Sequence, residues 1–259
     1  MEIQLGYYPQ LFLLVLARAG AIIGSVTILG KGRVPPRIRV AIALSLAILF
    51  TPMLAANNTF ATVHLTNAFE VIVAILNEVL LGMVVGLTFD IVFTACQLAG
   101  FIVGFGSSLT MAQVVDPTSG ISTDIIGTIL QLTCFMIFVL NDAHLVLIKM
   151  MYQSFAILPL NPSAWLTRDL FSDVVQLLQR AYEWGIRLAA PAIAVAFLLD
   201  LSLGLMSRMA PNFDILFMSL PIRLFAGLFT FGMILRYGGP FFSYMCEFTE
   251  GFCSRILIG

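Results

Sequence analysis

The chain has 259 residues, of which 60% are apolar and only 10% are charged. Soluble domains contain about 45–50% apolar and about 25% charged residues, so this chain has too few charged side chains to cover a surface in water. Together with a formal net charge of −1, the composition predicts an integral membrane protein. It excludes intrinsic disorder, nucleic-acid binding and a soluble enzyme core.

The first part of the chain predicts two membrane spans. A helix needs about 20 residues to cross the hydrocarbon core of a bilayer, and residues 9–29 and 40–55 are apolar runs of about that length. The turn between them, 30–39, carries four positive charges, which places it on the cytoplasmic side. The N-terminus is then on the opposite side. Because no basic residue precedes the first apolar run, we do not expect that run to be a cleaved signal.

The middle of the chain predicts long helices around an irregular piece. Residues 68–115 form an apolar stretch that is longer than one span needs. We expect one long helix followed by a partly inserted segment, with two short spans as the alternative. An irregular piece, 107–123, follows between glycines. A single long helix is expected over 124–158. Asn161-Pro162-Ser163 follows it and ends the helical pattern.

The last part of the chain predicts two or three further apolar helices. We expect interruptions at Pro191, Pro211, Pro221 and at residues 238–240, because proline and glycine break helices. The predicted fold is therefore all-α: a polytopic membrane protein of about six long kinked helices, packed as hairpins, with a plug-like loop at mid-chain.

Several ionisable residues fall within apolar runs, where a charge at the bilayer centre costs about 2.5–3.5 kcal/mol. Some are three or four residues apart on one helix face and are expected to pair locally, whereas Arg18 and Glu78 have no neighbouring partner in the sequence. Two explanations are open: contacts completed in a larger assembly around an aqueous path, or long-range pairing within the chain together with side chains that snorkel to the interface from helix ends. The candidates for ion pairs within the chain or between subunits are Arg18, Glu78, Arg180, Glu183, Arg187, Asp200 and Arg208.

Glycines four residues apart predict close helix packing, because they leave a flat stripe that a second backbone can approach. Three such pairs occur in the first half of the chain: Gly20/Gly24, Gly82/Gly86 and Gly100/Gly104.

No pattern in the sequence indicates catalysis. The four cysteines lie in apolar stretches without a CxxC pair, His64 and His144 belong to no HExxH motif, and no phosphate-binding loop is present. We therefore predict no enzyme, no cofactor and no metal site. A six-helix transporter or channel that acts alone is an alternative function, because Glu78 and Asp90 are carboxylates inside apolar runs.

Three runs resemble the FliR family of type III secretion export-gate proteins in their order and spacing. They are Leu-Thr-Met-Ala-Gln-Val-Val-Asp-Pro at 109–117, Leu-Gly-Leu-Met-Ser-Arg-Met-Ala-Pro at 203–211 and Val-Pro-Pro-Arg-Ile-Arg at 34–39. Asn141-Asp142-Ala143-His144 is similar to the family's Asn-Gly-x-His pattern, with Asp142 in place of glycine. The resemblance covers nearly the whole chain, and the run 219–223 makes it look flagellar.

This resemblance implies a subunit of the flagellar export gate in the bacterial inner membrane, at the basal body. The expected partners are FliP-like and FliQ-like subunits, an FlhB-like protein, unfolded protein substrates and membrane lipids. The whole chain, 1–259, is then one export-gate domain. Residues 1–160 correspond to a FliP-like half, and residues 161–259 to a FliQ-like helical hairpin.

The resemblance also maps a channel plug to residues 106–120. The expected hinges are Gly104, Gly106 and Gly120, and the expected gate residues are Leu109, Met111, Val114, Val115, Asp116 and Pro117. Apolar side chains in a narrow channel exclude water and block ions, and Asp-Pro fits a turn. An ordinary buried connection between helices is the alternative for this segment.

Overall fold

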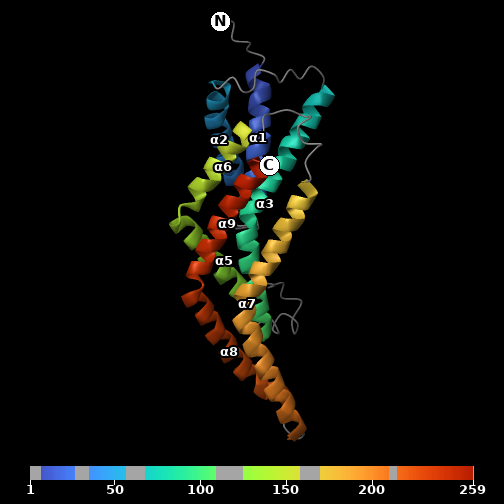
Figure 1. Ribbon diagram of the computed structural model, residues 1–259, viewed down its shortest axis with the longest axis vertical. Coiled ribbons are helices and arrows are strands. Elements are labelled where there is room, and N and C mark those ends of the chain that lie inside the picture. The colour runs from blue at the N-terminus through green and yellow to red at the C-terminus, as the bar shows by residue number, and fades with distance from the viewer. Residues whose placement is uncertain are drawn as a thin grey trace. The chain divides into compact units, whose positions relative to one another are not determined.

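The computed structural model describes residues 7–26, 35–56, 68–108, 125–157, 170–209 and 215–258. Within these ranges the chain is helical and contains no strand, which confirms the predicted all-α fold (Figure 1). The helices are α1 (Tyr7–Ser25), α2 (Pro36–Ala56), α3 (Ala68–Gly106), α5 (Ile125–Leu140), α6 (Ala143–Ile157), α7 (Leu170–Met209), α8 (Ile215–Tyr237) and α9 (Gly239–Ile258).

Four segments of these helices are long and apolar enough to cross a membrane. They are Pro36–Ala55, Phe69–Gly106, Ser172–Met209 and Ser219–Tyr237, and a fifth is obtained if α5 and α6 together form one broken span. The apolar segment Pro9–Ser25 in α1 is shorter. The predicted class of polytopic helical membrane protein is confirmed, although this criterion gives fewer spans than the expected six.

Two of the four expected helix breaks are wrong, whereas the break at 238–240 is confirmed between α8 and α9, and Pro211 lies outside the described residues. Pro191 lies inside α7 and Pro221 inside α8, because a membrane helix can re-satisfy the backbone group that a proline frees. Residues 68–106 form one helix, so the alternative of two short spans is also wrong.

The single helix expected over 124–158 is wrong as well. The chain leaves the helix at Asn141 and Asp142, where Asp142 has a φ of 55°. This left-handed conformation cannot continue a right-handed helix. The carbonyl oxygen of Asp142 then accepts a hydrogen bond from the Leu145 N–H at 2.9 Å, which starts α6.

The helices contribute to two compact units that interleave along the sequence. The first comprises residues 1–91, 142–178 and 247–259, and the second comprises residues 92–141 and 179–246. Both α3 and α7 contribute a part to each unit. The division into FliP-like and FliQ-like halves near residue 160 stays a prediction.

In the first unit, α1 packs closely against α3. A Cβ atom added at Gly82 would lie 2.5 Å from the carbonyl oxygen of Arg18, and one added at Gly86 would lie 2.6 Å from that of Ile22. The close packing expected of this glycine pair is therefore confirmed. In contrast, no described atom lies within 4 Å of a Cβ added at Gly20 or Gly24.

In the second unit, α3 is contacted by α5 and α7. A Cβ atom added at Gly100 would lie 2.1 Å from the Cα atom of Gly127 in α5. The ring centroids of Phe93 in α3 and Phe138 in α5 are 5.4 Å apart in an edge-to-face arrangement. Phe93, Cys96 and Ala99 are at most 1% exposed, so this part of α3 lies in the core of the unit.

Candidate functional site

A buried ion pair joins three helices of the first unit. Arg18 Nε of α1 lies 2.5 Å from Glu78 Oε2 of α3, and the two side chains are 0% and 4% exposed. Arg18 Nη1 also donates a hydrogen bond to the carbonyl oxygen of Ser154 in α6, at 2.9 Å. The guanidinium carbon lies 4.3 Å from the ring centroid of Phe155, a cation–π distance.

This ion pair decides between the two explanations for two of the ionisable residues that fall within apolar runs. Arg18 and Glu78 are far apart in the sequence, but the fold places them in contact, so the chain itself supplies their partners. Long-range pairing within the chain is therefore the explanation that applies to these two residues. Because Glu78 is neutralised by Arg18, it does not support an ion pathway through a transporter that acts alone.

A second group of charges lies along α7 in the second unit. Arg180 Nη1 lies 3.0 Å from Glu183 Oε2, and Arg187 Nη2 lies 2.5 Å from Glu183 Oε1. The three side chains remain 48%, 31% and 63% exposed. These pairs follow the spacing in the sequence, and they leave charged atoms on the surface of a helix that is apolar enough to span a membrane.

Asp200 and Arg208 lie further along α7. Asp200 forms an ion pair with Arg223 of α8, in which Asp200 Oδ1 and Arg223 Nη2 are 2.6 Å apart. Arg208 is exposed. Sequence reasoning did not select Arg223 as an ion-pair residue, because its partner lies on a different helix. The one signal in the sequence was that Arg223 is a charged residue within an apolar run.

Most of the predicted gate residues lie outside the described part of the chain. These are Leu109, Met111, Val114, Val115, Asp116, Pro117 and the hinge Gly120. The hinges Gly104 and Gly106 are described, and they form the last turn of α3. Whether they act as hinges stays a prediction.

The end of α3, directly before the gate segment, has a defined geometry. The Ser107 N–H donates to the Val103 carbonyl oxygen at 3.0 Å, and the Ser108 N–H donates to that of Phe105 at 3.2 Å. Ser108 has a φ of 59°, a left-handed conformation that ends the helix. The helix therefore ends at Gly106, and Ser107 and Ser108 form a turn directly before Leu109.

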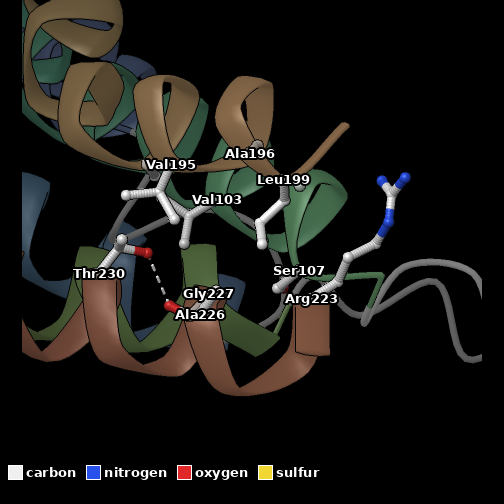
Figure 2. Close-up of a pocket in the computed structure, with 11 residues that line it drawn as sticks. Val103, Ser107, Val195, Ala196, Leu199, Arg223, Ala226, Gly227 and Thr230 are labelled. Carbon is white, nitrogen blue, oxygen red and sulfur yellow. Dashed lines mark hydrogen bonds between the residues drawn. The ribbon is translucent and has the colours of Figure 1, made fainter. Parts of the chain in front are cut away.

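A small pocket adjoins the end of α3 (Figure 2). It encloses about 210 Å³, part of it open to solvent, whereas small-molecule sites enclose about 300–1,000 Å³. We therefore do not interpret it as a ligand site. Its lining comes from α3, α7 and α8: Val103, Gly106, Ser107, Ala192, Val195, Ala196, Leu199, Arg223, Ala226, Gly227 and Thr230.

The described residues contain no group of three or more His, Cys, Asp or Glu side chains that could hold a metal ion. His144, the histidine considered for chemistry, is exposed on α6.

The described helices that are long and apolar enough to cross a membrane define a multi-pass helical membrane protein. Residues 10–249 match the family described as "Bacterial export proteins, family 1". The chain belongs to this family of bacterial export proteins.

Relatives place the chain more closely within the family. It is 28% identical over 243 residues to the flagellar biosynthetic protein FliR of Escherichia coli (strain K12), covering 94% of this chain and 90% of that protein. It is 29% identical to FliR of Caulobacter vibrioides, over 83% and 84% of the two chains. The Yop proteins translocation protein T of Yersinia pestis is 30% identical, over 72% of this chain and 70% of its own length. The resemblance to the FliR family is confirmed.

Proposed function

We propose that the chain is the FliR-like subunit of the bacterial flagellar type III export gate. It assembles with FliP-like and FliQ-like subunits and an FlhB-like protein in the inner membrane, at the flagellar basal body. There the complex conducts unfolded flagellar proteins. The observation that carries the proposal is the similarity to proteins named FliR over 83–94% of this chain and 84–90% of their own length.

The charged row on α7 supports assembly rather than a bundle that lies alone in lipid. Arg180 and Arg187 remain exposed after they pair with the half-buried Glu183, and all three lie in a segment, Ser172–Met209, long and apolar enough to span a membrane. Charged atoms facing hydrocarbon are costly, so this face fits water or a polar partner. The alternative of a transporter acting alone is weakened further by the neutralised Glu78.

The second part of the proposal is that residues 106–120 help to close the pore. Apolar side chains such as Leu109, Met111 and Val114 exclude water from a narrow channel and so stop ions. Methionine is unbranched and polarizable, which lets it deform around a passing chain and close again.

Deleting residues 106–120 tests the gate. The chain is co-expressed with its FliP-like and FliQ-like partners, and the purified complex is placed in liposomes for conductance measurements. We expect several-fold higher ion leakage than with the unchanged complex. A second variant, with residues 109–117 replaced by an equal number of Gly and Ser residues, keeps the length but removes the apolar side chains, and it should leak as well. Unchanged conductance in both variants would remove the gate assignment.

Native mass spectrometry of the complex, purified after expression from its own operon, tests the assembly. We expect this chain in one complex with FliP-like and FliQ-like subunits. A stable, monodisperse single chain that conducts in liposomes without partners would support the transporter instead.

A further inference from the structure

We propose that one face of α8 binds an anionic membrane phospholipid, with the headgroup phosphate at Arg236 and an acyl chain along Phe225 and Phe229. The inference does not depend on the export function, because it needs only that α8 lies against a bilayer. The segment Ser219–Tyr237 of α8 is long and apolar enough to cross a membrane. Phe225, Phe229, Gly232 and Arg236 are spaced four, three and four residues apart in α8, so they share one side of the helix. We call this side the lipid face.

The two sides of α8 differ in what covers them. Thr230 and Ile234, on the side opposite the lipid face, are only 2% and 4% exposed, because this side packs against the rest of the second unit. On the lipid face, Phe225 is 71% exposed and Phe229 is 70% exposed, so no described residue covers them. Two large apolar rings left in water are unfavourable. The lipid face therefore fits hydrocarbon.

Arg236 lies at the end of the lipid face, in the last turn of α8. Its side chain is exposed, and within the described ranges it forms no ion pair, whereas Arg223 of the same helix is paired with Asp200. The guanidinium carbon of Arg236 lies 5.5 Å from the ring centroid of Tyr237, which is itself 65% exposed. Tyrosine and arginine at the end of an apolar span are typical of the boundary between membrane and water. This pair therefore marks the level of the lipid headgroups.

The length of the lipid face matches one leaflet of a bilayer. Arg236 follows Phe225 by eleven residues, which at about 1.5 Å per residue is about 16 Å along the helix. Half of the hydrocarbon core is about 15 Å thick. Gly232 lies between the phenylalanines and the arginine, and nothing described lies within 4 Å of a Cβ atom added there. The glycine leaves open space beside the helix, where the glycerol backbone of a lipid can approach.

The charge at Arg236 selects the type of headgroup. A guanidinium binds phosphate oxygens with two parallel hydrogen bonds. The start of α9 at Gly239, three residues later, adds the positive end of a helix dipole at this level. Because no described carboxylate pairs with Arg236, nothing offsets this positive charge, and it would repel the ammonium of a zwitterionic headgroup. A headgroup with a net negative charge, such as that of phosphatidylglycerol, is therefore preferred.

Photocrosslinking of the complex, purified after expression from its own operon, tests this inference. Two lipid probes carry the same diazirine-labelled acyl chain, one on phosphatidylglycerol and one on phosphatidylcholine, and mass spectrometry maps the labelled peptides. The variants are Arg236→Gln, Arg236→Lys and Gly232→Leu. Gly204→Leu is the matched control, because Gly204 is an exposed glycine of α7 and nothing described lies within 4 Å of its added Cβ either. If the chain proves to have no partner subunits, the same labelling is done on the single chain.

We expect the phosphatidylglycerol probe to label residues 222–233 several-fold more than the phosphatidylcholine probe. Arg236→Gln should remove this preference and Arg236→Lys should keep most of it, because lysine keeps the charge. Gly232→Leu should lower the labelling by filling the open space, whereas Gly204→Leu should leave it unchanged.

Three results would overturn the inference. Equal labelling by the two probes would mean that the headgroup is not recognised, and no labelling of α8 would mean that a protein subunit covers the lipid face. A preference that persists in Arg236→Gln would mean that another group binds the headgroup. The comparison of the two probes needs no variant, so it decides even if Arg236→Gln does not assemble. A failure of the export function, shown by a chain without partners, would leave the expected labelling unchanged.

Discussion

The two units of the molecule treat charge in opposite ways. In the first unit, Arg18 and Glu78 form one pair with almost no exposed surface, supported by Ser154 and Phe155. In the second unit, Arg180 and Arg187 pair with Glu183 but remain largely exposed. The first pair is closed within the chain, whereas the second group still has charged atoms available to water or to another molecule.

The difference separates a structural role from an interaction role. A buried charge needs its partner, because removing one member leaves the other without compensation in a low-dielectric interior. An exposed pair contributes little to folding, because water and salt screen it. We therefore expect changes in the buried pair to affect the fold, and changes in the exposed row to affect assembly.

The largest effect is expected for Glu78→Leu, which removes the carboxylate that pairs with the buried Arg18. Breaking a buried pair in this way costs about 3–5 kcal/mol, so the variant should unfold at a much lower temperature or be degraded. Thermal unfolding of the purified complex in detergent measures the effect.

The control for this prediction is the double variant Arg18→Leu/Glu78→Leu. Replacing a buried ion pair by apolar side chains is often neutral, so the double variant should recover much of the lost stability. A double variant no more stable than Glu78→Leu would show that the region depends on specific hydrogen bonds, such as the one to Ser154, rather than on charge balance.

A smaller loss is expected for Gly82→Ala, within the same unit. The added Cβ would lie 2.5 Å from the Arg18 carbonyl oxygen and 2.7 Å from Ala21 Cβ, so α1 and α3 must separate. Overpacking of this kind costs about 1–3 kcal/mol. Gly24→Ala is the matched control on α1, because nothing described lies within 4 Å of its added Cβ. Thermal unfolding of both variants checks the prediction, and equal midpoints would contradict the close approach.

Reversing Glu183 to Arg addresses the exposed row. The two lost pairs are each worth only about 0.2–1 kcal/mol after solvent screening, so the fold should be little affected. The variant places three positive charges on one helix face, however, and the yield of assembled complex should fall several-fold. Asp169→Arg, a reversal in the polar stretch before α7, should assemble better. Equal yields of complex from both reversals would mean that this face meets no partner.

The sequence predicts well whatever depends on local pattern. Composition and apolar run length are enough for the all-α membrane class, because the bilayer requires long helices with internally satisfied backbones. The spacing of Arg180, Glu183 and Arg187 likewise predicts their pairs, because residues three and four apart share a helix face.

The sequence fails where the answer depends on contacts between distant helices. Arg18 and Glu78 are separated by 60 residues in the sequence, and Asp200 and Arg223 lie on different helices, so no local signal connects the members of either pair. Proline also failed to predict where helices end, because Pro191 and Pro221 lie inside helices. In a membrane protein the backbone group that a proline frees can be satisfied by other groups. Of the candidate gate, only its start at the end of α3 is described, and the predicted gate residues themselves remain predictions.

The smallest effect is expected at Asp142, in the turn that interrupts the helical conformation between α5 and α6. Its φ of 55° costs an L-residue roughly 1–2 kcal/mol, although Asp tolerates this region better than most. Asp142→Gly removes that strain but gives the unfolded chain more freedom, so we expect a net gain below about 1 kcal/mol. Asp142→Val, a β-branched residue, should instead lose stability, since such side chains rarely adopt a positive φ. Thermal unfolding of the two variants should therefore bracket the unchanged protein, and a valine variant as stable as the glycine variant would mean that the break does not need a left-handed residue.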